Sequence, residues 1–143
     1  MKRSQIREQI FKLLFRVEFN SIEDMPEQVE LFMEAPTLDT DEYNSEDVSF
    51  TEKEEKYVVS KYDDIVAHLS EIDETINGAA KGWTRDRIGK VELTILRLAV
   101  YEMKFDEEIP ESVAIDQAVE LSKKFGRDES YSFINGVLAN LAK

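Results

Sequence analysis

The stretch VELTILRLAVYEM, residues 91–103, places the tightest limit on how this chain can fold. Apolar residues stand there at positions 91, 93, 95, 96, 98, 99, 100 and 103, which spreads them almost all the way round a helix. A helix that is apolar on every side needs other elements to cover it. The pattern therefore predicts a buried, central helix that begins at Lys90.

Most of the remaining chain repeats apolar residues every three or four positions, which is typical of amphipathic helices. The capping-box pair Thr51 and Glu54 marks one helix start, and Pro110 fits a first helical position. No run of four or more residues alternates as a strand would. We expect an all-α fold of about seven helices in two small bundles. Besides the helix from Lys90, the expected helices cover about 3–19, 25–34, 51–69, 70–78, 110–126 and 132–141.

The segment SFINGVLANL is ambiguous, because Asn-Gly between apolar runs favours a β-hairpin. Apolar residues nevertheless keep helical spacing from Phe133 to Leu141, straight through Asn135-Gly136. We therefore expect a helix, at a cost of about 1 kcal/mol for glycine relative to alanine. A close approach of another helix to Gly136 would explain the missing side chain.

Length and composition are those of one domain. With 143 residues, 42% of them hydrophobic, the chain can bury a core, and we expect a single domain with lobes at about 1–80 and 81–143. The absence of cysteine excludes disulfides and thiolate metal sites. No apolar run approaches the roughly 18 residues of a membrane span, so we expect a soluble, cytoplasmic protein without a membrane partner.

The formal charge of −13 is unevenly distributed along the chain. Residues 1–16 carry +4, residues 17–55 carry −13, and residues 56–143 carry −4. Such a field repels nucleic acid at long range, so any RNA contact must use a local positive patch. The acidic residues 35–50 read as an exposed loop.

No catalytic or metal site is evident in the sequence. His68 is the only histidine, and no second nitrogen or sulfur ligand stands at helical spacing from it, so we interpret it as a helix-surface or boundary residue. Adjacent acids such as Asp63 and Asp64 point in different directions, unlike a carboxylate pair across a cleft. We expect no enzyme activity, no metal and no cofactor.

Two basic segments are candidates for binding. Arg3 and Arg7 stand at i and i+4 beside Phe11 and Phe15, and guanidinium groups next to aromatic rings can hold phosphates while a base stacks. The alternative is an ordinary solvated amphipathic helix. The second segment, KGWTRDRIGK at 81–90, contains the only tryptophan, which either packs in the core or stacks on a base. That segment could instead bind the chain's own acidic loop.

The ordered motifs FKLLFRVEF, RIGKVELTILRLAVYEM, IPESVAIDQAVELSKKFG and ESYSFINGVLANL resemble the NusB family of bacterial transcription antitermination factors along nearly the whole chain. The resemblance implies an all-helical protein of two bundles without catalytic activity. It also implies binding to the boxA element of ribosomal RNA transcripts together with the ribosomal protein NusE. The expected setting is the RNA polymerase elongation complex with other Nus factors.

The resemblance also implies a set of site residues. The arginine-rich N-terminal motif of the family maps to Lys2, Arg3 and Arg7. Here Ser4, Gln5 and Ile6 interrupt the run of cations. For Phe133, packing in the hydrophobic core is as good an interpretation as a place on the RNA-binding surface. The implied RNA-binding residues are Lys2, Arg3, Arg7, Phe15, Glu129, Ser130 and Phe133, and the implied partner-binding residues are Phe15 and Glu92.

Another class of function remains open from the sequence. Residues 17–55 could dock a basic ribosomal protein, which would make the chain a protein-interaction adaptor without RNA contact of its own. The sequence leaves open a monomer or a homodimer, the RNA bases that are read, and the choice between terminator readthrough and ribosome biogenesis.

Overall fold

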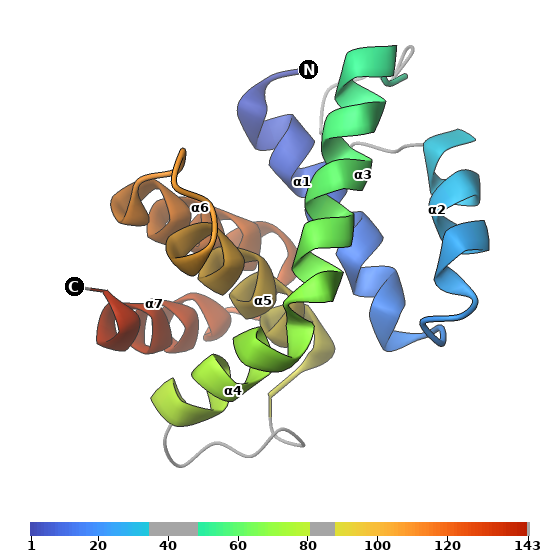
Figure 1. Ribbon diagram of the computed structural model, residues 1–143. Helices are drawn as coiled ribbons and strands as arrows, with labels where there is room; N and C mark the ends of the chain where they lie inside the picture. Colours follow the sequence, from blue (N-terminus) through green and yellow to red (C-terminus); the bar gives the residue numbers. More distant parts are fainter. Residues whose placement is uncertain (35–48, 81–87, 143) are drawn as a thin grey trace. The chain divides into compact units, whose positions relative to one another are not determined.

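The computed structural model of the chain describes residues 1–34, 49–80 and 88–142, and within these residues all regular secondary structure is helical (Figure 1). This confirms the all-α prediction. The helices are α1 (Arg3–Phe15), α2 (Met25–Glu34), α3 (Glu52–Ala67), α4 (Leu69–Ala79), α5 (Lys90–Lys104), α6 (Glu111–Phe125) and α7 (Ser130–Leu141), and a short 3-10 helix, η1 (Arg16–Glu18), follows α1.

The chain divides into two compact units, Met1–Asp64 and Ile65–Lys143, and the division falls near the end of α3. In the second unit α4 packs against α5 and α7. The sequence analysis placed α4 in the first lobe, with a boundary at about residue 80. Helix periodicity shows where a helix lies, but it does not show which neighbours cover its apolar stripe.

The first unit is built on the apolar stripe of α1. Leu13 and Leu14 are completely buried, and Ile10 is nearly so. Met25 and Phe32 supply the buried side of α2. The helix expected over about 3–19 is present as α1 and the short η1 that follows it.

The start of α3 has the hydrogen bonds that its sequence predicted. The backbone N–H of Thr51 donates to Glu54 Oε1 at 2.9 Å, and the N–H of Glu54 donates to Thr51 Oγ1 at 3.1 Å. These reciprocal bonds satisfy backbone donors that the first turn of a helix leaves without partners. The acidic loop expected before this helix lies, for residues 35–48, outside the described residues.

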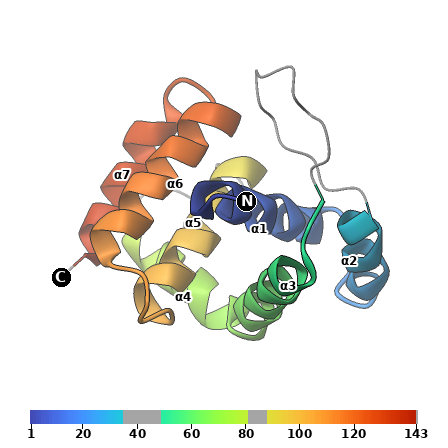
Figure 2. The ribbon, with the colours of Figure 1, turned by 90° about the horizontal axis from the view of Figure 1, so that it is seen from above.

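The second unit is organised around α5, as the apolar pattern predicted. All residues from Glu92 to Glu102 are buried. In Figure 2, α6 lies beside both α5 and α7, in agreement with the contacts between these helices. Within the described residues, no helix has both the length and the apolar character needed to cross a membrane.

Several helix ends differ by small steps from the sequence predictions, among them those of α4 and α6. α4 begins at Leu69, one residue before Ser70, and it continues through Asn77-Gly78 to Ala79. Pro110 is the N-cap of α6 and not its first helical residue, with an extended ψ of 146°. α6 ends at Phe125, and Gly126 is its C-cap, as expected.

The explanation offered for Gly136 was wrong. The helix does continue through Asn135-Gly136, since α7 spans Ser130–Leu141. However, a Cβ built on Gly136 would meet no atom of the described residues within 4 Å, and the residue is exposed. No close helix therefore requires glycine at this position, and its cost in helix propensity is uncompensated by packing in the described structure.

Candidate nucleic-acid interface

The basic start of the chain lies at the N-terminal end of α1. Lys2 and Arg3 are exposed, and Arg7, one helical turn further on, is half-buried. The backbone N–H of Lys2 donates to Gln5 Oε1 at 2.8 Å, which fixes the point where the helix begins. Lys2 is therefore the N-cap of α1, and Arg3 and Arg7 lie in its first two turns.

The other two cations of the first sixteen residues are used inside the protein. Lys12 Nζ lies 3.4 Å from the carboxylate of Glu8, whose side chain is only 7% exposed. Arg16 Nη1 donates to the carbonyl oxygen of Gln28 at 3.2 Å and to its side-chain oxygen at 3.1 Å. The Arg16 guanidinium also lies 5.2 Å from the centre of the Phe32 ring. The local positive patch is therefore smaller than the charge count of the sequence suggested.

The amino group of Met1 is held by α3. It lies 2.6 Å from Glu54 Oε2. Hydrogen bonding to this ammonium group, and then to the Thr51 backbone, lowers the pKa of Glu54. The same carboxylate thus caps α3 and holds the residue that precedes Lys2.

A row of aromatic rings follows the cations along α1 and η1. The Phe11 and Phe15 rings are stacked with centres 6.1 Å apart, and Phe19 meets Phe15 edge-on at 5.1 Å. Phe11 is buried, Phe15 is half-buried, and Phe19 is 61% exposed. The predicted site residue Phe15 therefore lies between a core ring and a surface ring.

The remaining predicted site residues belong to the second unit, at the start of α5 and α7. Ser130 Oγ donates to Glu92 Oε1 at 2.6 Å, and both residues are buried. Glu129 is exposed, and Phe133 is half-buried. Glu92 and Ser130 are buried and hydrogen-bonded to each other, and Phe133 is half-buried. Glu129 therefore has the most exposed side chain of these four residues.

Arg127 and two glycines complete the surroundings of Glu92, and the sequence analysis missed all three. The backbone N–H of Arg127 donates to Ser130 Oγ at 3.0 Å, while its 80% exposed guanidinium lies 3.6 Å from Glu92 Oε1. A Cβ on Gly89 would collide with Glu92 Oε2. A Cβ on Gly126 would lie 2.7 Å from the Ser122 carbonyl oxygen. The sequence signal of this tight packing was glycine at two helix ends, Gly89 as the N-cap of α5 and Gly126 as the C-cap of α6.

Other candidates from the sequence do not form part of this geometry. His68 precedes α4 and packs its ring on Phe105, with centres 4.3 Å apart. In the described parts of the chain, no group of three or more His, Cys, Asp or Glu residues is arranged to hold a metal ion. Most of the basic segment at 81–90, Trp83 included, lies outside the described residues.

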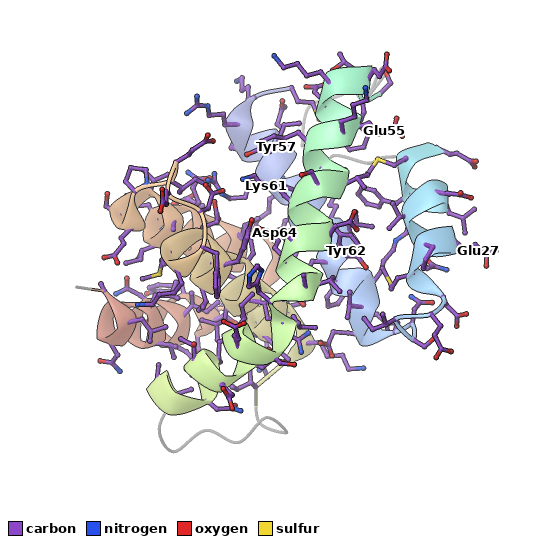
Figure 3. The ribbon with its side chains drawn as sticks, viewed as in Figure 1. Glu27, Glu55, Tyr57, Lys61, Tyr62 and Asp64 are labelled. Atoms are coloured by element: carbon purple, nitrogen blue, oxygen red, sulfur yellow. The ribbon has the colours of Figure 1, made fainter. Side chains whose placement is uncertain are left out.

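Burial perturbs one further titrating side chain. Tyr62 on α3 is buried, and this burial, with a smaller contribution from the charge of Asp63, raises the pKa of Tyr62 to about 12. Figure 3 shows Tyr62 on α3 together with Tyr57 and Lys61. Lys61 Nζ lies 5.5 Å from the centre of the Tyr57 ring. These contacts belong to the packing of α3, and none of them involves the cations of α1.

The arrangement is that of an all-helical protein with a cationic and aromatic helix and no metal cluster in the described residues. The sequence pattern of the NusB family matches residues 4–143, and the chain belongs to that family. It is 46% identical to the transcription antitermination protein NusB of Agathobacter rectalis over 99% of this chain and 100% of the relative. It is 40% identical to the protein of the same name from Lachnoclostridium phytofermentans, over 99% and 98% of the two chains.

Solved structures show the same fold. NusB of T. maritima has a TM-score of 0.77 and 30% identity, covering 99% of this chain and 91% of that one. A chain from the structure of antitermination factors NusB and NusE in complex with dsRNA has a TM-score of 0.71 and 27% identity. That match covers 96% of this chain and 92% of the other.

Proposed function

We propose that this chain is a transcription antitermination factor that binds boxA RNA of nascent ribosomal transcripts jointly with NusE. In that role it supports elongation by RNA polymerase with other Nus factors, in the cytoplasm and without catalysing a reaction. The observation that carries the proposal is the family match over residues 4–143, together with antitermination relatives up to 46% identical over essentially the full length. The solved complex of NusB and NusE with dsRNA supports both partners.

The first contact with RNA is made by Lys2, Arg3 and Arg7. Arg3 and Arg7 lie on consecutive turns of α1, and a guanidinium group can hold two phosphate oxygens by parallel hydrogen bonds. Phosphate contacts position a protein on nucleic acid and carry no sequence information by themselves. These cations therefore give affinity, whereas selectivity for boxA comes from other contacts and from NusE.

Selectivity uses the aromatic and acidic residues. Phe15 offers a ring edge to a base or to the partner, and Phe133 does the same from α7. The exposed carboxylate of Glu129 can accept hydrogen bonds from base amino groups. In this proposal Glu92 and Ser130 act through the hydrogen bond that joins them, which holds the start of α7 in place for Glu129.

The proposal is tested by titrating labelled boxA RNA into Arg7→Ala in the presence of NusE at several salt concentrations. Losing one phosphate contact weakens binding to all RNAs alike and reduces the slope of log affinity against log salt by about one unit. Lys56→Ala is the matched control, because Lys56 is 78% exposed on α3 and its loss changes the formal charge equally. An unchanged affinity and slope for Arg7→Ala, or an equal effect of Lys56→Ala, removes Arg7 from the site.

A gel shift separates this function from that of a protein adaptor without RNA contact. The adaptor alternative is favoured by the exposed acids of the first unit, which attract a basic ribosomal protein. boxA and scrambled RNA are each compared with and without NusE. Selective binding of boxA RNA that needs both proteins supports the antitermination function. If the chain binds NusE but leaves the affinity of NusE for RNA unchanged, the result supports the adaptor.

A further inference from the structure

Arg127 lies in the turn between α6 and α7, and the RNA contacts of the proposed function do not use it. Its backbone is held at both polar groups, because its N–H donates to Ser130 Oγ at 3.0 Å and its carbonyl oxygen accepts from the N–H of Ser130 at 2.9 Å. Its side chain, in contrast, is 80% exposed. A fixed position of the backbone therefore presents a cation to solvent.

The ion pair that Arg127 forms with Glu92 is weak. Arg127 Nε lies 3.6 Å from Glu92 Oε1, which is longer than the roughly 2.7–2.9 Å of a charge-assisted hydrogen bond. Water screens the pair on the arginine side, and pairs of this kind contribute little to stability.

Glu92 does not depend on this arginine for its place in the structure. Its carboxylate accepts the hydrogen bond of Ser130 Oγ at 2.6 Å. It also stands in the first turn of α5, where the helix dipole favours a negative charge. Glu92 therefore stays stabilised when the guanidinium of Arg127 turns to another anion.

The charges around Arg127 give it a role toward phosphate. It is the only lysine, arginine or histidine of residues 126–142. The exposed acids Asp128 and Glu129 follow it, and the proposed function assigns base amino groups to Glu129. A nucleotide that brings its base to Glu129 brings a phosphate to the same turn, and carboxylates alone would repel that phosphate. Arg127 is the cation with which this turn can offset the repulsion.

We propose that Arg127 binds a backbone phosphate of the RNA whose base Glu129 contacts, and that it exchanges Glu92 for this phosphate. The assignment rests on the proposed function and adds a cation of the second unit to the three at the start of α1. The guanidinium gains two parallel hydrogen bonds to phosphate in place of one long contact with a carboxylate oxygen. A basic protein is disfavoured as the occupant, because like charges repel. Glu92 acts as a positioning residue, which holds the guanidinium near the start of α7 before RNA arrives.

The test titrates labelled boxA RNA against Arg127→Ala in the presence of NusE at several salt concentrations. The slope of log affinity against log salt should become shallower by about 0.7, the value for one phosphate contact on a single strand, which corresponds to about fivefold weaker binding at roughly 0.1 M salt. Scrambled RNA should lose the same factor, because a phosphate contact carries no sequence information. The matched control is Lys104→Ala, which removes an exposed cation at the opposite end of α5 and should leave the slope unchanged.

Two further measurements distinguish a phosphate contact from a structural role. Arg127→Lys keeps the charge but not the planar fork, so it should restore the slope and give an affinity between those of the wild type and Arg127→Ala. Urea unfolding of Arg127→Ala should keep the wild-type midpoint, because the side chain is 80% exposed.

The outcomes separate this proposal from the one on which it rests. If the slope of Arg127→Ala equals that of the wild type, or if Lys104→Ala has the same effect, Arg127 does not contact phosphate, while joint RNA binding with NusE stands. A lower urea midpoint with an unchanged slope would assign Arg127 a structural role and overturn the proposal. A loss confined to boxA would assign it to a base, and weaker binding of NusE in the absence of RNA would assign it to the protein partner; both contradict the proposal. If the wild type with NusE does not bind boxA at all, both proposals are overturned.

Discussion

The ion pair between Arg97 and Asp73 gives the sharpest test of the packing described here. Arg97 lies on the buried helix α5, and its guanidinium is only 3% exposed. Its Nε donates to Asp73 Oδ1 at 2.9 Å and its Nη2 donates to Asp73 Oδ2 at 3.0 Å, in the two-point geometry that suits arginine and carboxylate. Asp73 belongs to α4 and is partly exposed, so the pair joins two helices of the second unit.

Asp73→Ala should destabilise the fold by about 3 kcal/mol. Removal of one partner of a buried ion pair leaves a charge that has lost both its water and its counter-ion, which typically costs about 3–5 kcal/mol. The lower value applies because Asp73 is 24% exposed and water can reach part of the site. For a chain of this size, the loss corresponds to a fall in Tm of roughly 10 °C. Replacing both residues with apolar side chains should recover much of the loss, since it removes the stranded charge.

Urea unfolding followed by far-UV circular dichroism measures the effect as a lower midpoint at an unchanged slope. Glu52→Ala is the matched control, because Glu52 forms an ion pair with Lys56 in which the side chains are 87% and 78% exposed. An exposed pair of this kind contributes less than about 1 kcal/mol. Equal effects of Asp73→Ala and Glu52→Ala would show that the Arg97 site is not desolvated and would refute the reasoning.

Two other predictions use the helix ends and the N-terminus. Gly136→Ala should raise the stability by up to about 1 kcal/mol, since its Cβ meets nothing within 4 Å in the described structure. Gly126→Ala should lower the Tm, because its Cβ would press on the Ser122 carbonyl. Thermal melts of both variants check these two predictions, and a lower Tm for Gly136→Ala would contradict the first. The lowered pKa of Glu54 means that its contribution to stability is present above its ordinary pKa of 4.5 and is lost as the pH falls through the lowered value in the folded state. Glu54→Gln should therefore be less stable than the wild type at neutral pH and approach it in acid, as urea titrations at several pH values would show, while Glu55→Gln is the control.

The sequence was sufficient to predict the helices because their signals are local. Apolar residues on all sides of the segment 91–103 required a central helix, and Thr51 with Glu54 fixed a helix start to within one residue. These features depend on backbone geometry over a few residues, so spacing alone reveals them. Gly136 shows the limit, because a glycine in a helix has the same sequence signature whether a neighbour is close or absent.

The candidate site was harder to predict, because its charges depend on tertiary contacts. Arg16 looked like a cation of the basic patch, yet it is bonded to Gln28, twelve residues further along the chain. Glu92 and Ser130 are 38 residues apart, and no spacing rule predicts the hydrogen bond between them. Sequence and resemblance therefore proposed a set of site residues, but they did not show which of those side chains are buried.

The distribution of charge explains why binding of RNA by this protein would need a partner. Lys12 and Arg16 make internal contacts, and the cations that the proposed function assigns to phosphate, Lys2, Arg3 and Arg7, belong to a chain of net charge −13. Three phosphate contacts give weak binding, with a slope of log affinity against log salt of only about −2 to −3. A basic partner would neutralise acids of residues 17–55 and add cations of its own. Within the proposed function, the partner thus supplies positive charge that α1 alone does not provide.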